Sequence, residues 1–142
     1  MKYILYTSTA SIYFRPEMLE AMLTGFRKSN HKHGITGMLV YSEGTFMQFI
    51  EGKNDTVDRL IKNIIKDKTH HSVMIWENSP SQVRLFSDWS MSFKNVSIGE
   101  FGKMLGLAGR PLRTITPLPT PLVNYMVGLI TPPLLNQSGL QL

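Results

Sequence analysis

Short runs of apolar residues with a strand-like pattern open the chain and recur further along it. Residues 2–7 and 72–77 are rich in aromatic and β-branched side chains, which favour strands. Two more runs, residues 37–42 and 45–51, flank the dipeptide Glu43-Gly44, which suits the tight turn of a hairpin. The pattern therefore predicts four strands, with the middle two paired as a hairpin.

Two longer segments carry apolar residues at the spacing of an amphipathic helix. The first follows a predicted turn at residues 8–11, begins at Pro16, where no N–H is needed, and ends near Asn30. Gly34 suits the turn after it. The second helix follows a polar capping region at residues 53–55. The apolar stripes are Met18, Leu19, Met22, Leu23 and Phe26 in the first helix and Val57, Leu60, Ile61, Ile64 and Ile65 in the second.

The order of these elements, strand, helix, strand, strand, helix, strand, predicts an α+β fold of the ferredoxin-like type. Right-handed crossovers then place the first and third strands side by side in the middle of the sheet, with both helices on one face. Side chains alternate across a strand, so Tyr6 and Gln48 meet under the helices if both face them. A short fifth strand is predicted at residues 89–93.

The last third of the sequence has a different character. Residues 98–107 and 122–130 are predicted to be helices, and residues 110–121 between them contain four prolines. We expect residues 1–94 to form one domain and residues 95–142 a helical extension that covers the far face of the sheet or a second subunit, because its apolar side chains would be costly to expose. These side chains include Met104, Leu105, Leu107, Tyr125, Met126 and Leu129.

Composition limits the chemistry that is available. Of the 142 residues, 42% are hydrophobic and 18% are charged, which is typical of a soluble globular protein. The absence of cysteine excludes disulfides, thiolate nucleophiles and iron–sulfur clusters. Because no apolar run is long enough for a bilayer and no signal peptide is evident, we expect a cytoplasmic protein. The net charge of +5 is spread along the chain and does not favour nucleic-acid binding.

Gln48 is the polar residue that the strand pattern does not explain. It stands within a run of large apolar side chains, from Phe46 to Ile50. A primary amide buried there must find hydrogen-bond partners or cost about 1–3 kcal/mol. Gln48 is therefore the first candidate for a functional residue.

Other candidate chemistry is weaker. The histidine pairs His31 with His33 and His70 with His71 lack the spacing of metal ligands, so they are predicted to be surface or capping residues. The glycines do not fit a nucleotide-binding loop. The third strand lacks the basic and glycine residues of RNA-binding sheets.

Taken together, several of these residues resemble the BLUF family, the blue-light sensors that use FAD. The likeness covers about the first 94 residues and is most specific between the GITG and IEG motifs. It is carried by Tyr6 in the first strand, Asn30 in NHKHGITG, Gln48 in FMQFIEG, and Trp89 with Met91 in FSDWSM.

The resemblance implies a flavin, FAD or alternatively FMN, held without a covalent bond between the two helices. By the family pattern, Asn30 hydrogen-bonds the carbonyl edge of the flavin, and Gln48 lies between Tyr6 and the flavin. Asp67 is implied to help hold the ribityl or phosphate end.

One position departs from the family pattern on the second helix. An arginine found there in some members is replaced by Asn63 in this chain, with Lys62 and Lys66 beside it. We therefore expect the contact with the flavin phosphate to shift to these lysines.

The function implied by the resemblance is a photoreceptor and not an enzyme. Tyr6 gives an electron to the excited flavin and a proton to the adjacent amide, and Gln48 changes its hydrogen bonds by rotation or tautomerisation. The late strand carrying Trp89 and Met91 relays this change. Because no output domain is expected in the chain, the signal is expected to reach a separate partner protein or to change a homo-oligomer.

Two other function classes remain open from the sequence. The first is a flavin-dependent redox enzyme that uses the same pocket. The second is a ferredoxin-like interaction module without a ligand, such as an RNA-binding one. The orientation of the Gln48 amide, and the choice between Trp89 and Met91 beside the flavin, do not follow from the sequence.

Overall fold

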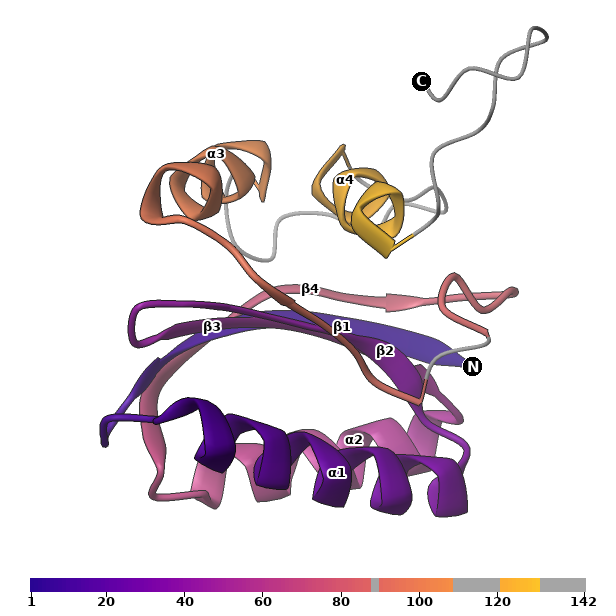
Figure 1. Cartoon of the computed structure of the whole chain (residues 1–142). Helices are drawn as coiled ribbons and strands as arrows, with labels where there is room; N and C mark the ends of the chain where they lie inside the picture. The colour runs from indigo at the N-terminus through magenta and orange to yellow at the C-terminus, as the bar shows by residue number, and fades with distance from the viewer. Residues whose placement is uncertain (88–89, 109–120, 131–142) are drawn as a thin grey trace, which may run out of the picture.

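The computed structural model describes residues 1–87, 90–108 and 121–130 (Figure 1). The first six elements follow the predicted order, and two helices follow a fifth strand. In chain order the elements are β1 (Lys2–Ala10), α1 (Pro16–His33), β2 (Thr36–Ser42), β3 (Thr45–Gly52), α2 (Asn54–Lys66), β4 (His70–Pro80), β5 (Ser92–Asn95), α3 (Ile98–Ala108) and α4 (Pro121–Ile130).

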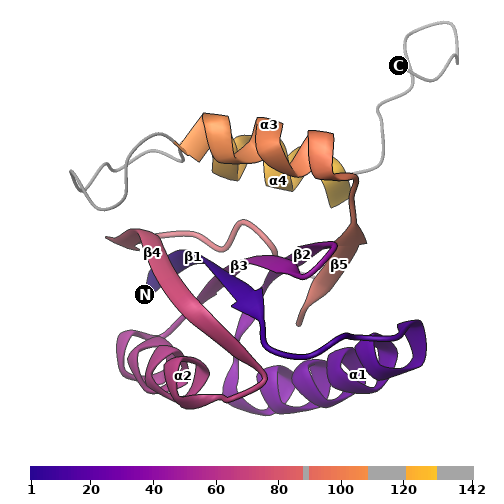
Figure 2. The same cartoon turned by 90° about the vertical axis from the view of Figure 1, so that its left-hand side faces the viewer.

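The strands form one sheet in the order β4-β1-β3-β2-β5. β1 and β3 are antiparallel neighbours in its centre, as the right-handed crossovers predict. α1 and α2 cover one face of the sheet and α3 and α4 cover the other, which gives three layers (Figures 1 and 2). The predicted α+β ferredoxin-like class is confirmed.

The hairpin between β2 and β3 turns at Glu43 and Gly44, as the sequence predicts. Both residues have positive φ, 41° and 90° respectively, so the two-residue loop has the backbone of a type I′ turn. This turn fixes the register that begins with Ser42 opposite Thr45. The same register places Leu39 opposite Gln48.

The predicted ends of two strands are wrong. β1 continues through Ser8 and Thr9, where a turn was expected, because both residues pair with β3. β4 runs over His70–Pro80 instead of 72–77, because it follows β1 along its length through two register shifts. The neighbouring strand, and not the apolar pattern, sets these lengths.

The fifth strand also lies later than predicted, at Ser92–Asn95 instead of 89–93. It runs parallel to β2, with Ser92 opposite Met38. Met91 therefore precedes the strand, which corrects the expectation that it belongs to a strand. Trp89 lies outside the described residues.

The helix ends follow from backbone geometry. α1 runs three residues beyond the predicted end at Asn30 and stops at Gly34, whose φ of 68° allows its N–H to reach the carbonyls of Asn30 and His31. α2 begins after its N-cap residue Lys53, within the predicted capping region, but no side-chain hydrogen bond caps the helix there. Within the described ranges, no helix is long and apolar enough to cross a membrane.

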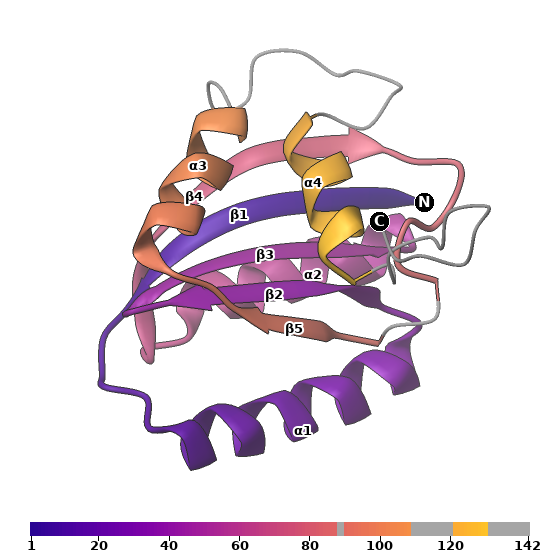
Figure 3. The same cartoon turned by 45° about the horizontal axis from the view of Figure 1, so that its top comes forward.

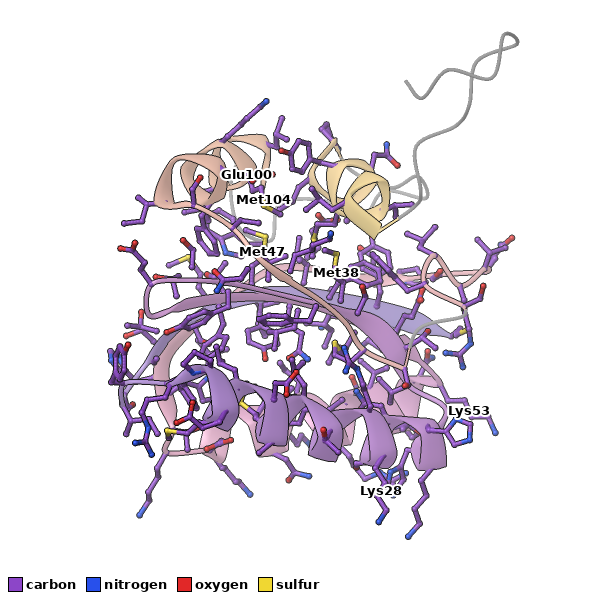
Figure 4. All side chains as sticks on the ribbon, in the orientation of Figure 1. Lys28, Met38, Met47, Lys53, Glu100 and Met104 are labelled. Carbon is purple, nitrogen blue, oxygen red and sulfur yellow. The ribbon has the colours of Figure 1, made fainter. Side chains whose placement is uncertain are left out.

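Each face of the sheet carries its own apolar core. Under α1 and α2 lie Ile4, Tyr6 and Ile50, which confirms the predicted parity. On the other face, α3 and α4 lie side by side across the strands (Figure 3). Met38 and Met47 of the sheet and Met104 of α3 are fully buried between these layers (Figure 4). α3 and α4 thus lie on the far face of the sheet, which is one of the two places expected for them (Figure 1).

Candidate functional site

Tyr6 and Gln48 are directly opposite each other on the two central strands. The Tyr6 hydroxyl donates a hydrogen bond to Oε1 of Gln48. The two side chains are only 4% and 5% exposed, so water does not compete for this bond. A phenol and an amide therefore meet under the helices, as the strand alternation predicts.

The other end of the Gln48 amide is also occupied. Its Nε2 donates to Sδ of Met91 at 3.4 Å, and the Met91 side chain is 1% exposed. Thioether sulfur is a weak acceptor, so this contact is readily exchanged for a better one. The structure thus gives Gln48 a defined orientation, with its oxygen toward Tyr6 and its nitrogen toward Met91.

Burial keeps Tyr6 protonated. Removal of the phenol from water, and to a smaller extent the negative charge of Asp67, raises the pKa of Tyr6 above its usual value. A neutral Tyr6 retains the proton that it donates to Gln48. The pair is accordingly set as donor and acceptor throughout the physiological pH range.

Two side chains of α1 hold the segment that carries Met91. Nδ2 of Asn30 donates to the Ser90 carbonyl at 2.9 Å, and Nε of Arg27 donates to the Met91 carbonyl at 2.9 Å. Asn30 is buried near the end of the helix, whereas Arg27 reaches the segment from the surface. The last turns of α1 therefore set where Met91 lies.

A buried carboxylate holds the loop before Met91. Glu51 is 0% exposed at the end of β3, and its side chain accepts hydrogen bonds from the backbone N–H groups of Leu85 and Phe86 at 2.8 and 2.7 Å. Thr36 donates to the same carboxylate at 2.8 Å. Arg84 in turn donates to the Gly34 carbonyl at 2.7 Å, which joins the loop to the end of α1.

A cavity of about 230 Å³ opens between α1 and α2. Its lining combines the apolar side chains of Ile35 and Leu60 with the amides of Asn30 and Asn63. Apolar walls suit the faces of a flavin ring, and amides suit its carbonyl edge, so these residues fit the expected cofactor. The lining is completed by Ser29, His33, Thr56 and Arg59.

The other predicted cofactor residues lie near the end of α2. Lys62 and Lys66 are exposed and do not line this cavity. The Asp67 carboxylate accepts hydrogen bonds from the N–H and hydroxyl of Thr69 at 2.9 and 2.8 Å. Its partial burial disfavours the charged form, but these bonds and the nearby His70 prevail, and the pKa of Asp67 lies below its usual value.

His70 is a capping residue, as predicted for one of the histidines. Its Nε2 donates to the Ile64 carbonyl in the last turn of α2, which leaves Nδ1 for the hydroxyl of Ser8 at 2.8 Å. Its ring also lies edge-on to Tyr6, with centroids 6.5 Å apart. His70 therefore joins α2 to the strand that carries the phenol.

Sequence reasoning missed the roles of Arg27, Glu51 and Arg59. Arg59 and Asn63 are four residues apart on α2, so helical spacing places them on one face and was a usable signal. Glu51 lies in a predicted strand among apolar residues, and a carboxylate buried there needs hydrogen-bond donors. That requirement was a second usable signal. Nothing in the sequence pointed to Arg27, because its acceptor is the backbone carbonyl of Met91, 64 residues later in the chain.

Comparison with known proteins gives a consistent result. A family model described as BLUF, sensors of blue-light using FAD, matches residues 1–92. The chain is also similar to the photoactivated adenylate cyclase subunit beta of Euglena longa, with 31% identity over 81 residues. That match covers 57% of this chain and only 9% of the length of the relative.

Solved structures show the same likeness. The dark-state structure of BlrB, described as a BLUF protein, has a TM-score of 0.64 and 29% identity, covering 75% of this chain and 80% of that one. The ground-state structure of BlsA covers 92% of this chain and 98% of its own, with a TM-score of 0.63. At 20% identity, the second match shows a shared fold alone.

Proposed function

The chain belongs to the BLUF family of blue-light sensors that use FAD, and from that premise we propose that Tyr6 and Gln48 form its light-driven switch. The observation that carries this proposal is the continuous contact from the Tyr6 hydroxyl through the Gln48 amide to the Met91 sulfur. All three side chains are buried and closely packed, so a movement of one of them requires its neighbour to move as well.

We place the flavin in the cavity between α1 and α2. Asn30 and Asn63 there offer amide groups to the carbonyl edge of the ring, and the apolar side chain of Leu60 offers a wall. Contact of the phosphate end with Lys62 and Lys66, and of the ribityl end with Asp67, stays a prediction. FAD is the expected form, with FMN as the alternative.

The bound flavin supplies the absorption of blue light and an acceptor for an electron. Tyr6 would provide that electron and release its phenolic proton along its hydrogen bond to Oε1 of Gln48. A proton at Oε1 makes that oxygen a donor but leaves Nε2 a donor as well, and Nε2 becomes an acceptor only if it gives up one of its own protons. If that proton returned to Tyr6 together with the electron, the phenol would be restored and the amide would be left as its imidic tautomer. Nε2 would then no longer donate to the Met91 sulfur. The Met91 side chain would then be released from Gln48, while Asn30 and Arg27 still hold the backbone of the segment.

Illumination of the purified, flavin-loaded protein tests the function. We expect the flavin absorption band to shift to longer wavelength under blue light without bleaching and to return in darkness. An absorption spectrometer with a blue-light source measures both steps. Simple photoreduction of the flavin, or turnover of an added electron donor, would instead indicate a redox enzyme.

We propose that residues 1–94 are the sensor and that residues 95–142 pass the signal on. In support, α3 and α4 pack on the sheet face opposite the switch, through side chains of β1 and β3 that alternate with Tyr6 and Gln48. The receiver is proposed to be a separate signalling protein or a homo-oligomer of this chain. A cytoplasmic location and the lack of an enzymatic activity of its own also belong to this proposal.

A further inference from the structure

Met91 lies at the one point of the switch that no strand holds. Its sulfur accepts from Gln48, but β5 begins at the next residue, Ser92. Pairing between β1 and β3 holds Tyr6 opposite Gln48. Met91 has no such strand partner, because the pairing of β5 with β2 begins at Ser92. Another contact must keep the sulfur in place.

Arg27 makes that contact from α1. Its Nε donates to the Met91 carbonyl at 2.9 Å, next to the bond from Asn30 to the Ser90 carbonyl. Arg27 is outside the lining of the cavity between α1 and α2, and its bond is to backbone, so it acts independently of the cofactor pocket. A hydrogen bond from a charged donor is stronger than one between neutral groups.

We propose that Arg27 is a positioning residue that holds the Met91 sulfur at Gln48 and so sets how fast the lit state returns to the dark state. The inference rests on the proposed role of Gln48. Return to the dark arrangement requires Met91 to be back in place as the acceptor of Nε2. The return rate therefore follows the fraction of molecules in which Met91 occupies this position, and Arg27 raises that fraction.

The test uses two uncharged replacements of Arg27 that differ in one property. Arg27→Gln keeps an N–H donor at the same number of bonds from the backbone, whereas Arg27→Met keeps the length of the side chain without a donor. We expect the dark return of R27M to be about fivefold slower than that of R27Q, as loss of about one hydrogen bond implies. Flavin content should be equal in both.

Lys28→Met provides a matched control. Lys28 is the exposed neighbour of Arg27 on α1, and its side chain points away from the sheet (Figure 4). It carries the same charge, and no hydrogen bond joins it to the Met91 segment in the described part of the chain. We expect K28M to return to the dark state at the rate of the unaltered protein.

A second background separates positioning from a general structural effect. In Met91→Leu the sulfur acceptor is absent and the side-chain volume is nearly kept. R27M and R27Q should then return at equal rates, because there is no sulfur to position. A persistent difference between R27M and R27Q in this background, or equal rates in the unaltered background, would overturn the inference. Neither result touches the proposed function, which fails only if the unaltered protein shows no reversible shift.

Discussion

Gln48 shows why a polar residue is tolerated in the middle of a central strand. Both ends of its amide have a partner, so its burial does not carry the cost of about 1–3 kcal/mol for an unsatisfied group. One of those partners is a strong phenol donor and the other is a weak sulfur acceptor. The contact with sulfur is therefore the one that the amide gives up more easily.

Removing either member of the pair should stop the switch without emptying the cavity. We expect Tyr6→Phe and Gln48→Leu each to retain flavin, because neither residue lines the cavity between α1 and α2. Each should abolish the reversible red shift, measured by absorption after blue light. Tyr41→Phe is a control on the same core face. A normal photocycle in Y6F or Q48L would refute the role of that residue.

Tyr3 predicts how stability depends on alkaline pH. Burial, followed by the negative charge of Glu77, raises the pKa of Tyr3 to about 12. An unfolded tyrosine ionises near pH 10, about two units lower. Between pH 10 and pH 12 the Tyr3 phenol therefore keeps its proton in the native state and loses it in the unfolded state. The contribution of the protonated phenol to the free energy of unfolding is complete below pH 10 and is lost as pH rises toward 12.

The corresponding measurement is urea unfolding at pH 9, 10 and 11. Above pH 10, each such tyrosine lowers the free energy of unfolding by up to about 1.4 kcal/mol per pH unit. Tyr3→Phe should remove this share of the slope, while that of Tyr6 remains. An unchanged slope in Y3F would show that the Tyr3 phenol is not responsible.

At the level of elements, the end of β3 and the loop before β5 behave as one unit. Three donors converge on the carboxylate of Glu51, two of them backbone N–H groups of the loop. A loop without a ladder of its own is thereby fixed to the end of a central strand. The arrangement explains how Met91 reaches the switch from a segment that is not a strand.

Replacing Glu51 by glutamine should loosen this loop. The amide nitrogen of Gln cannot accept a hydrogen bond, so at least one buried N–H or hydroxyl loses its partner. We expect a loss of about 1–3 kcal/mol in the free energy of unfolding, measured by urea denaturation. Glu43→Gln, at an exposed turn position, removes the same charge and should change little. Equal effects of E51Q and E43Q would contradict this account.

For the whole molecule, the two faces of one sheet carry different tasks. Adjacent residues of β3 point to opposite faces, so Gln48 faces the side of α1 and α2 with Tyr6, while Met47 and Phe49 pack with α3 and α4. Methionine packs adaptably, and Met38, Met47 and Met104 line this second interface. β3 therefore contacts the switch on one face and the C-terminal helices on the other.

Deleting residues 98–142 should consequently affect more than signalling. The deletion exposes the apolar sheet face around Met38 and Met47, so we expect residues 1–97 to self-associate and to lose stability. Light scattering after size exclusion and thermal unfolding measure these effects. Met104→Ala, which leaves the chain length intact, should weaken the interface by about 2–5 kcal/mol. If residues 1–97 were monomeric and as stable as the full chain, this role of the helices would be contradicted.

The sequence was sufficient for the element order, the hairpin, the central β1 and β3 pair and the facing of Tyr6 and Gln48. Each of these depends on local periodicity, turn chemistry or strand alternation, which are properties of neighbouring residues. The motifs around the same residues were also sufficient to recognise the family. Where strands end and where Met91 lies were not predictable in this way.

Those remaining features depend on partners that are distant in sequence. β1 extends through Ser8 because β3 is there to pair with it, and the place of β5 depends on the edge of β2. Met91 is held by Arg27 of α1, 64 residues earlier in the chain, which donates to the Met91 backbone carbonyl. No pattern of residues in the sequence predicts where that carbonyl lies. Only the folded chain brings that donor and acceptor together, since a backbone acceptor is the same at every residue.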